Sequence, residues 1–206
     1  MHTNSFSKIF IFISACSLLF ACSSDNPKIS LLPSGATILA FGDSITYGTG
    51  AGRNESYPAI LETLSGRTVI NAGIPGEITA EGRKRLPDLL EKHSPDLLIL
   101  CHGGNDMMRQ MNGKVMQENL RAMIRDTRNR GVSVVLISVP KPALFLSSAD
   151  GYEQIAEELS VPIEDNILAD ILSDNALKSD QIHPNAKGYK ILAEAIHILL
   201  QESGAL

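Results

Sequence analysis

Residues 37–46 read TILAFGDSIT, a run rich in apolar residues that ends in Gly42, Asp43 and Ser44. A short run of Ile and Leu closed by a glycine is typical of a buried parallel strand. The glycine permits a tight turn after the strand, so we expect Ser44 to project from the start of the next segment. This stretch therefore predicts the first strand of a sheet and a serine displayed at its carboxyl end.

The same kind of run recurs along the chain. Three runs rich in Ile, Leu and Val, bounded by Gly, Pro or Asp, predict further buried strands: 68–71, 96–101 and 132–139. Segments with apolar residues at helical spacing separate and follow them: 57–65, 79–93, 115–130, 149–159 and 185–200. Residues 161–163 predict a short edge strand. This alternation predicts a three-layer α/β/α domain with a parallel sheet and right-handed crossovers.

The composition fits one soluble domain with a sizeable core. The chain has 206 residues, of which 44% are hydrophobic and 20% are charged. Its net charge is -5 and it has no basic tract, so nucleic acid is not an expected partner. Aromatic residues make up 5%, with no Trp, which leaves few platforms for stacking bases or sugars. Nothing in the sequence demands a protein partner.

The N-terminus has the layout of a bacterial secretory signal. Residues 9–20 are almost continuously apolar, follow Lys8 and precede Ala21 and Cys22. The run is shorter than the ~20 residues that a membrane-spanning helix needs. Residues 19–22 (LFAC) resemble the lipoprotein cleavage box, in which the cysteine becomes the lipidated first residue of the mature chain. The alternative is a plain secretory signal in which Cys22 is incidental.

We therefore expect three parts: a lipoprotein signal peptide over 1–21, a lipidated tether over 22–35, and a folded domain over 36–206. The protein would be exported to the cell envelope and anchored to a membrane through Cys22. In a cell with two membranes it would lie on the periplasmic side.

Residues that suggest chemistry follow the expected strands. In a sheet of this type ligands bind outside the carboxyl ends of the strands. The second strand leads into Gly76, and the third leads into Asn105 through two glycines, which let the backbone approach a ligand closely. Near the C-terminus, Asp180 precedes His183 by three residues, so its carboxylate can fix the imidazole tautomer and leave the other nitrogen free as a base. On this pattern alone, Ser44 fits either a nucleophile or a helix N-cap, and we interpret His102 as structural.

Four sequence blocks in this order resemble the SGNH (GDSL) hydrolase family, and most closely its branch of thioesterase I, lysophospholipase L1 and bacterial arylesterases. The blocks are GDSITYG at 42–48, Gly76, GGND at 103–106 and DQIHP at 180–184. The resemblance implies a flavodoxin-like sheet with strand order 2-1-3-4-5. It also implies that neither a metal ion nor an organic cofactor is required.

The resemblance assigns roles to five residues. Ser44 would be the nucleophile, His183 the general base and later acid, and Asp180 the residue that orients the imidazole. The oxyanion hole would consist of the Ser44 N–H, the Gly76 N–H and the side-chain amide of Asn105.

The expected function is hydrolysis of short- to medium-chain carboxylic esters through an acyl-enzyme on Ser44, with a small-molecule ester or lipid as substrate. Thioesters and lysophospholipids are further candidate substrates. One alternative is an O-acetylesterase acting on envelope polysaccharide or peptidoglycan. An alternative of another class is a non-catalytic surface-binding module, in which some of the five catalytic and oxyanion-hole residues would be missing.

The segment after the fourth strand, 140–146, is shorter than its counterpart in the thioesterase-like branch, so the acyl-chain length stays open. Six apolar residues fit either the lining of an acyl pocket or the core: Met107, Met108, Met111, Leu144, Phe145 and Leu146.

Overall fold

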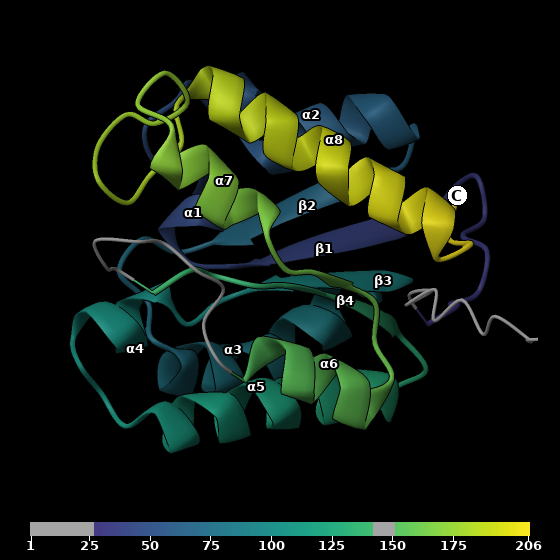
Figure 1. Cartoon of the computed structure of the whole chain (residues 1–206). Helices are drawn as coiled ribbons and strands as arrows, with labels where there is room; N and C mark the ends of the chain where they lie inside the picture. Colours follow the sequence, from purple (N-terminus) through teal and green to yellow (C-terminus); the bar gives the residue numbers. More distant parts are fainter. Residues whose placement is uncertain (1–26, 142–150) are drawn as a thin grey trace, which may run out of the picture.

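The computed structural model describes residues 27–141 and 151–206. They form a three-layer α/β/α domain around a five-stranded parallel sheet in the order β2-β1-β3-β4-β5 (Figure 1). The strands are β1 (Thr37–Gly42), β2 (Thr68–Gly73), β3 (Leu97–Cys101), β4 (Ser133–Ile137) and β5 (Ile163–Glu164). The fold class and the strand order 2-1-3-4-5 are therefore confirmed.

The register of the central strands aligns the loops that carry the candidate site. Gly42, the last residue of β1, pairs with Gly73 of β2 on one side and with Cys101 of β3 on the other. A Cβ atom on Gly42 would lie 2.0 Å from the carbonyl oxygen of Cys101. A glycine is therefore required where the chain leaves β1, and three loops begin at the same edge of the sheet.

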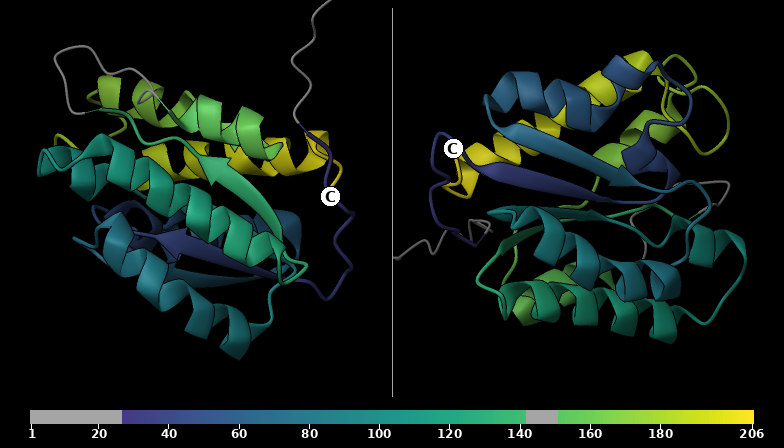
Figure 2. Two further views of the ribbon diagram at one scale, coloured as in Figure 1. Left: turned by 90° about the horizontal axis from the view of Figure 1, so that it is seen from below. Right: turned by 180° about the vertical axis from the view of Figure 1, so that it is seen from behind.

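Helices cover both faces of the sheet, and the views in Figures 1 and 2 agree on their arrangement. One face carries four helices: α1 (Ser44–Tyr47), α2 (Tyr57–Ser65), α7 (Ile167–Ser173) and α8 (Ala186–Glu202). The other face carries α3 (Thr79–His93), α4 (Gly104–Met108), α5 (Gly113–Arg128) and α6 (Tyr152–Leu159). A 3-10 helix, η1 (Arg53–Glu55), precedes α2.

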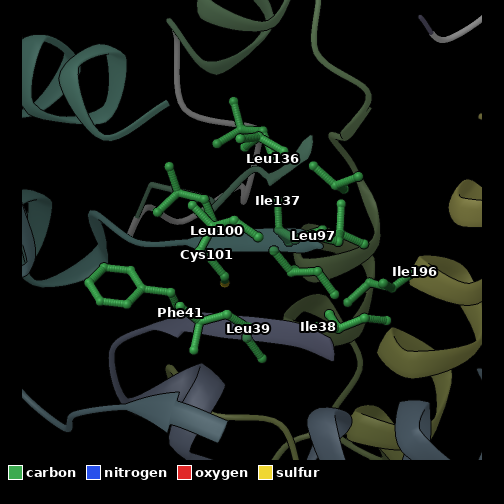
Figure 3. Packing of buried hydrophobic residues seen from close by; sticks show 14 of the residues in the cluster. Ile38, Leu39, Phe41, Leu97, Leu100, Cys101, Leu136, Ile137 and Ile196 are labelled. Carbon is green, nitrogen blue, oxygen red and sulfur yellow. The ribbon is translucent and has the colours of Figure 1, made fainter. Parts of the chain in front are cut away.

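Apolar side chains of the central strands form the core between these layers (Figure 3). Every residue of β3 is fully buried, as expected for a strand that is covered on both faces. Ile196 of α8 reaches the core from one helical layer. Removing a Leu or Ile side chain from water contributes ~1.5–3 kcal/mol, so this burial is the main source of stability.

Helices α2 and α3 have the predicted bounds, whereas other elements differ from the sequence analysis. Helix α5 begins at Gly113 because the side chain of Asn112 accepts hydrogen bonds from the backbone N–H groups of Lys114 and Val115. The edge strand is Ile163–Glu164 and not 161–163. Helix α7 was absent from the sequence analysis; it is short, and its stability depends on packing against α8.

The structured part begins before residue 36, where the sequence analysis places the start of the domain. The N–H groups of Ile29 and Leu32 donate to the carbonyl oxygens of Ser203 and Ala205, at 2.9 and 2.8 Å. Leu32 is buried. The second half of the expected tether over 22–35 is therefore attached to the C-terminal residues, whereas the expected signal peptide and Cys22 lie outside the described residues. Across 27–141 and 151–206, none of the helices combines the length and apolar character needed to cross a bilayer.

Candidate active site

Ser44, His183 and Asp180 form a continuous chain of hydrogen-bonding groups. The Oγ atom of Ser44 lies 3.0 Å from Nε2 of His183, although the two residues are 139 positions apart in the sequence. Nδ1 of the same ring lies 2.8 Å from Oδ2 of Asp180. The fold thus joins the end of the first strand to the loop that enters the last helix.

Ser44 is displayed by the turn that leaves β1. Asp43, and not Ser44, caps α1: its Oδ1 atom accepts a hydrogen bond from the Ile45 N–H at 3.1 Å. The hydroxyl of Ser44 is therefore not used as a helix cap. Helix α1 ends at Tyr47, and the next residue, Gly48, has a φ of 97°, which favours glycine. Burial raises the pKa of Asp43, because a carboxylate loses hydration inside the protein.

The loop before α8 fixes both the position and the tautomer of His183. Oδ1 of Asp180 accepts hydrogen bonds from the backbone N–H groups of Ile182 and His183, at 2.8 and 2.9 Å. Burial raises the pKa of Asp180, but the hydrogen bonds from the His183 ring and these two amides outweigh it and hold that pKa below the usual 3.8. An ionised Asp180 accepts a hydrogen bond from the Nδ1–H group of His183, which leaves the lone pair of Nε2 directed at Ser44.

The three predicted oxyanion donors follow neighbouring strands: Ser44 begins α1, Gly76 lies in the loop after β2, and Asn105 lies in the first turn of α4. Asn105, at the start of α4, is buried, and its Nδ2 atom donates to the carbonyl oxygen of Glu77 at 3.0 Å and to Oδ2 of Asp43 at 3.3 Å. Gly76, with a φ of 81°, lies in the loop after β2. Within 27–141 and 151–206, neither the Ser44 N–H nor the Gly76 N–H donates to another protein group. Both amides therefore remain available to a ligand.

A small hollow of about 40 Å³ opens beside the serine and histidine. Asn105 also lines it, whereas Gly76 does not. Its walls are mostly apolar and come from several elements: Ile45, Met108, Val139, Pro140, Leu172 and Ile182. A larger hollow of about 520 Å³ lies at the amino ends of β3 and β4, away from these residues.

The six apolar residues singled out in the sequence separate in the structure. Met108 lines the hollow, whereas Met107 packs against the core and Met111 is exposed without lining the hollow. The other three, at 144–146, lie outside the described residues. Leu172 of α7 and Ile182 line the hollow, and neither lies in a pattern that predicted this from the sequence.

A buried ionic cluster behind the site was also missed. The carboxylate of Glu77 accepts two hydrogen bonds from Arg85, at 2.7 and 2.6 Å, and lies 3.1 Å from Nε2 of His102. Burial raises the pKa of Glu77, but the hydrogen bonds from His102 and Arg85 and the charge of Arg85 together lower it. His102 is fully buried, which agrees with its interpretation as structural. Glu77 directly follows the predicted Gly76, and this adjacency is the one signal that could have drawn attention to it.

The described residues contain no group of three or more His, Cys, Asp or Glu side chains arranged to hold a metal ion. The groups that the structure brings together at the site are a serine hydroxyl, an imidazole, a carboxylate and amides. Such a set can activate a hydroxyl for attack on a carbonyl carbon and offer donors to the negative oxygen that forms.

Comparison with known proteins gives a consistent family match. The GDSL-like lipase/acylhydrolase family matches residues 40–191. An arylesterase from Vibrio mimicus is 30% identical over 190 residues, which cover 87% of this chain and 92% of the arylesterase. Thioesterase 1/protease 1/lysophospholipase L1 of Escherichia coli K12 is 28% identical, over 77% of this chain and 80% of the enzyme. The solved structure of TesA superposes with a TM-score of 0.73 and 27% identity, over 81% of this chain and 99% of TesA.

Proposed function

The chain belongs to the GDSL-like lipase/acylhydrolase family and is a carboxylic ester hydrolase, and we propose that Ser44 is its nucleophile, His183 its general base and Asp180 the residue that orients His183. The resemblance to SGNH (GDSL) hydrolases is thereby confirmed. The observation that carries the proposed roles is the line of contacts from Asp180 through both ring nitrogens to the Ser44 hydroxyl, at 2.8 and 3.0 Å. A non-catalytic binding module does not fit this complete set.

The proposed reaction passes through an acyl-enzyme. His183 takes the proton of Ser44 while Oγ attacks the ester carbonyl carbon, and the carbonyl oxygen becomes an oxyanion. The N–H groups of Ser44 and Gly76 stabilise this oxyanion. The amide of Asn105 joins them by turning to the oxyanion the hydrogen that otherwise makes the longer bond, 3.3 Å, to Oδ2 of Asp43, while its bond to the Glu77 carbonyl oxygen stays. When the ester bond breaks, His183 gives the proton to the leaving alcohol or thiol. Water activated by His183 then releases the acid and restores Ser44.

The hollow beside Ser44 supports a preference for the short end of the expected acyl range. One water molecule needs ~10–15 Å³ of such space, so about 40 Å³ suits an acyl chain of a few carbon atoms. The small space is also compatible with the proposed alternative, an O-acetylesterase acting on envelope polysaccharide or peptidoglycan. The arylesterase and thioesterase relatives support aryl esters and thioesters as substrates.

We expect kcat/KM to fall as the acyl chain of p-nitrophenyl esters lengthens from acetate to octanoate. Met108→Ala should raise the octanoate-to-acetate ratio by about 10-fold, because one methylene in a pocket contributes ~1–3 kcal/mol to discrimination. Met108 is 40% exposed, so its truncation should leave the fold intact. Met111→Ala is the matched control, since Met111 is similarly exposed and does not line the hollow.

The dependence of kcat/KM on acyl-chain length also distinguishes the short- to medium-chain esterase from the O-acetylesterase. A preference for acetate by more than about 100-fold over butyrate favours the O-acetylesterase, and release of acetate from acetylated peptidoglycan or polysaccharide would then be the next assay. A profile that rises toward octanoate contradicts a small acyl pocket. A shift in the ratio that is equal in the Met108→Ala and Met111→Ala variants contradicts the role given to Met108.

We propose that the protein is anchored to a membrane of the cell envelope through a lipid on Cys22. The apolar run over 9–20 and the lipoprotein-like box over 19–22 support this. Mass spectrometry of the mature protein should find an N-terminal Cys22 carrying acyl groups, and Cys22→Ser should release the protein from the membrane fraction. An unmodified N-terminus beyond residue 22 contradicts the anchor and leaves the esterase assignment untouched.

A further inference from the structure

The side chain and backbone of Glu77 contact the two loops that carry the proposed oxyanion donors. Glu77 directly follows Gly76, and its carboxylate lies 3.1 Å from the ring of His102, in the loop between β3 and α4. Its backbone carbonyl accepts the hydrogen bond from Asn105 Nδ2 at 3.0 Å. One residue therefore links the Gly76 donor to the Asn105 donor.

Arg85 of α3 holds the same carboxylate from another side. Its Nε and one terminal nitrogen donate to the two carboxylate oxygens of Glu77, a fork geometry that only a guanidinium supplies. The terminal nitrogen also donates to the carbonyl oxygen of Ala72 in β2 at 3.1 Å. The guanidinium carbon lies 4.2 Å from the centre of the Phe41 ring. The carboxylate is thus fixed relative to the sheet.

His102 has a defined proton position in this cluster. The Gly103 N–H donates to Nδ1 of His102 at 3.0 Å, so the proton of the neutral ring lies on Nε2 and is donated to Glu77. The hydroxyl of Tyr152 donates to the carbonyl oxygen of His102 at 2.6 Å. The ring and the backbone of His102 therefore hold the second loop at a fixed place against the carboxylate.

We propose that Glu77, held by Arg85 and His102, is a positioning residue that sets the separation between the Gly76 N–H and the Asn105 amide in the oxyanion hole. This inference rests on the assignment of those two donors in the proposed function. Oxyanion donors are effective because they are preorganised, and a displacement of about 1 Å costs ~10²-fold in rate. Glu77 touches no reacting atom, so it acts only through the two donors.

A purely structural role would have a different signature, and the chain offers a matched control. Glu158 of α6 also accepts hydrogen bonds from two arginines, Arg121 at 2.7 Å and Arg125 at 2.9 Å, but it joins α5 to α6 away from the hollow. Replacing Glu158 removes a carboxylate that binds two arginines, and replacing Glu77 removes one that binds an arginine and a histidine. Only the replacement of Glu77 should displace the oxyanion donors.

The experiment compares Glu77→Gln, Glu158→Gln, Asn105→Ala and the double variant Glu77→Gln/Asn105→Ala on p-nitrophenyl acetate. Asn105→Ala should lower kcat by ~10²- to 10³-fold, as expected for one oxyanion donor. Glu77→Gln should lower kcat by about 10- to 100-fold with KM changed less than about 3-fold, whereas Glu158→Gln should change kcat less than about 2-fold. In the Asn105→Ala background, the loss caused by Glu77→Gln should shrink at least about 3-fold, because both changes act on the same donor.

Circular dichroism and thermal unfolding establish that each variant is folded. If Glu77→Gln does not fold, Arg85→Lys replaces it, because lysine keeps the charge and loses the fork; kcat should then fall about 3- to 10-fold with KM unchanged. Unchanged kcat in Asn105→Ala contradicts the oxyanion hole itself and this inference with it. If Asn105→Ala lowers kcat while Glu77→Gln or Arg85→Lys behaves like Glu158→Gln, or if the losses in the double variant simply multiply, the positioning role is wrong and the proposed catalytic set stands.

Discussion

Replacing Ser44 by Ala should lower kcat for p-nitrophenyl acetate by at least about 10⁴-fold. The change removes the only atom that can form the acyl bond, and loss of the serine in another triad hydrolase costs ~10⁶-fold. What remains comes from the oxyanion donors and substrate binding, which do not depend on the hydroxyl. Since Asp43 and not Ser44 caps α1, alanine should change the free energy of unfolding by less than about 0.5 kcal/mol.

The measurement for Ser44→Ala is steady-state hydrolysis together with labelling by a fluorophosphonate, which attaches to an activated serine. The wild type should gain one adduct by mass spectrometry, and the variant should gain none. Ser173→Ala is the matched control, because Ser173 is an exposed serine on α7 whose hydroxyl donates to the carbonyl oxygen of Asp170. Activity in Ser44→Ala within tenfold of the wild type would show that another group carries the acyl intermediate.

The order of strands and helices could be predicted because each element has a local pattern of apolar residues. A buried parallel strand such as Leu97–Cys101 is apolar at every position, and helices such as Thr79–His93 repeat their apolar residues at helical spacing. Helix α7 escaped prediction because Ile167–Ser173 is too short to show a period and forms through contact with α8. The attachment of residues 29–32 to the C-terminus escaped for the same reason, since it depends on where the chain ends in space.

Part of the candidate site could also be predicted from local motifs, and part could not. Ser44, Asn105 and the pair Asp180–His183 lie in short motifs. Ser44 and Asn105 meet because loops at the carboxyl ends of parallel strands gather at one edge, whereas the loop with Asp180 and His183 follows α7 and is placed by the packing of α7 and α8. The partners of Glu77 do not follow from any motif. Arg85 and His102 reach its carboxylate only because the register of β2, β1 and β3 brings two loops and one helix together. Such contacts depend on side-chain placement, which the sequence alone does not specify.

Asp180→Asn should lower kcat by roughly 10³-fold while leaving KM nearly unchanged. Asparagine has the shape of aspartate, so its oxygen can still accept the backbone N–H groups of Ile182 and His183. Its amide nitrogen, however, then faces Nδ1 of His183 as a donor. The ring must accept at Nδ1 and carry its proton on Nε2, where it points at Ser44 and cannot take the serine proton.

The pH dependence distinguishes the wrong tautomer of His183 in Asp180→Asn from a loss of activity caused by protonation of Asp180 at acid pH. Because the pKa of Asp180 is lowered below 3.8, its carboxylate stays ionised from pH 5 to 9. The stability that the ionised Asp180 contributes is present above pH 3.8 and is lost as the pH falls through its folded-state pKa. The Asp180→Asn deficit in kcat should therefore persist at about the same size across pH 6 to 9.

Asp174→Asn controls for the loop, because the side chain of Asp174 also accepts a hydrogen bond from a backbone N–H, that of Ala176. A deficit below about threefold would mean that the backbone of the loop alone orients His183, and that the carboxylate is dispensable for the reaction.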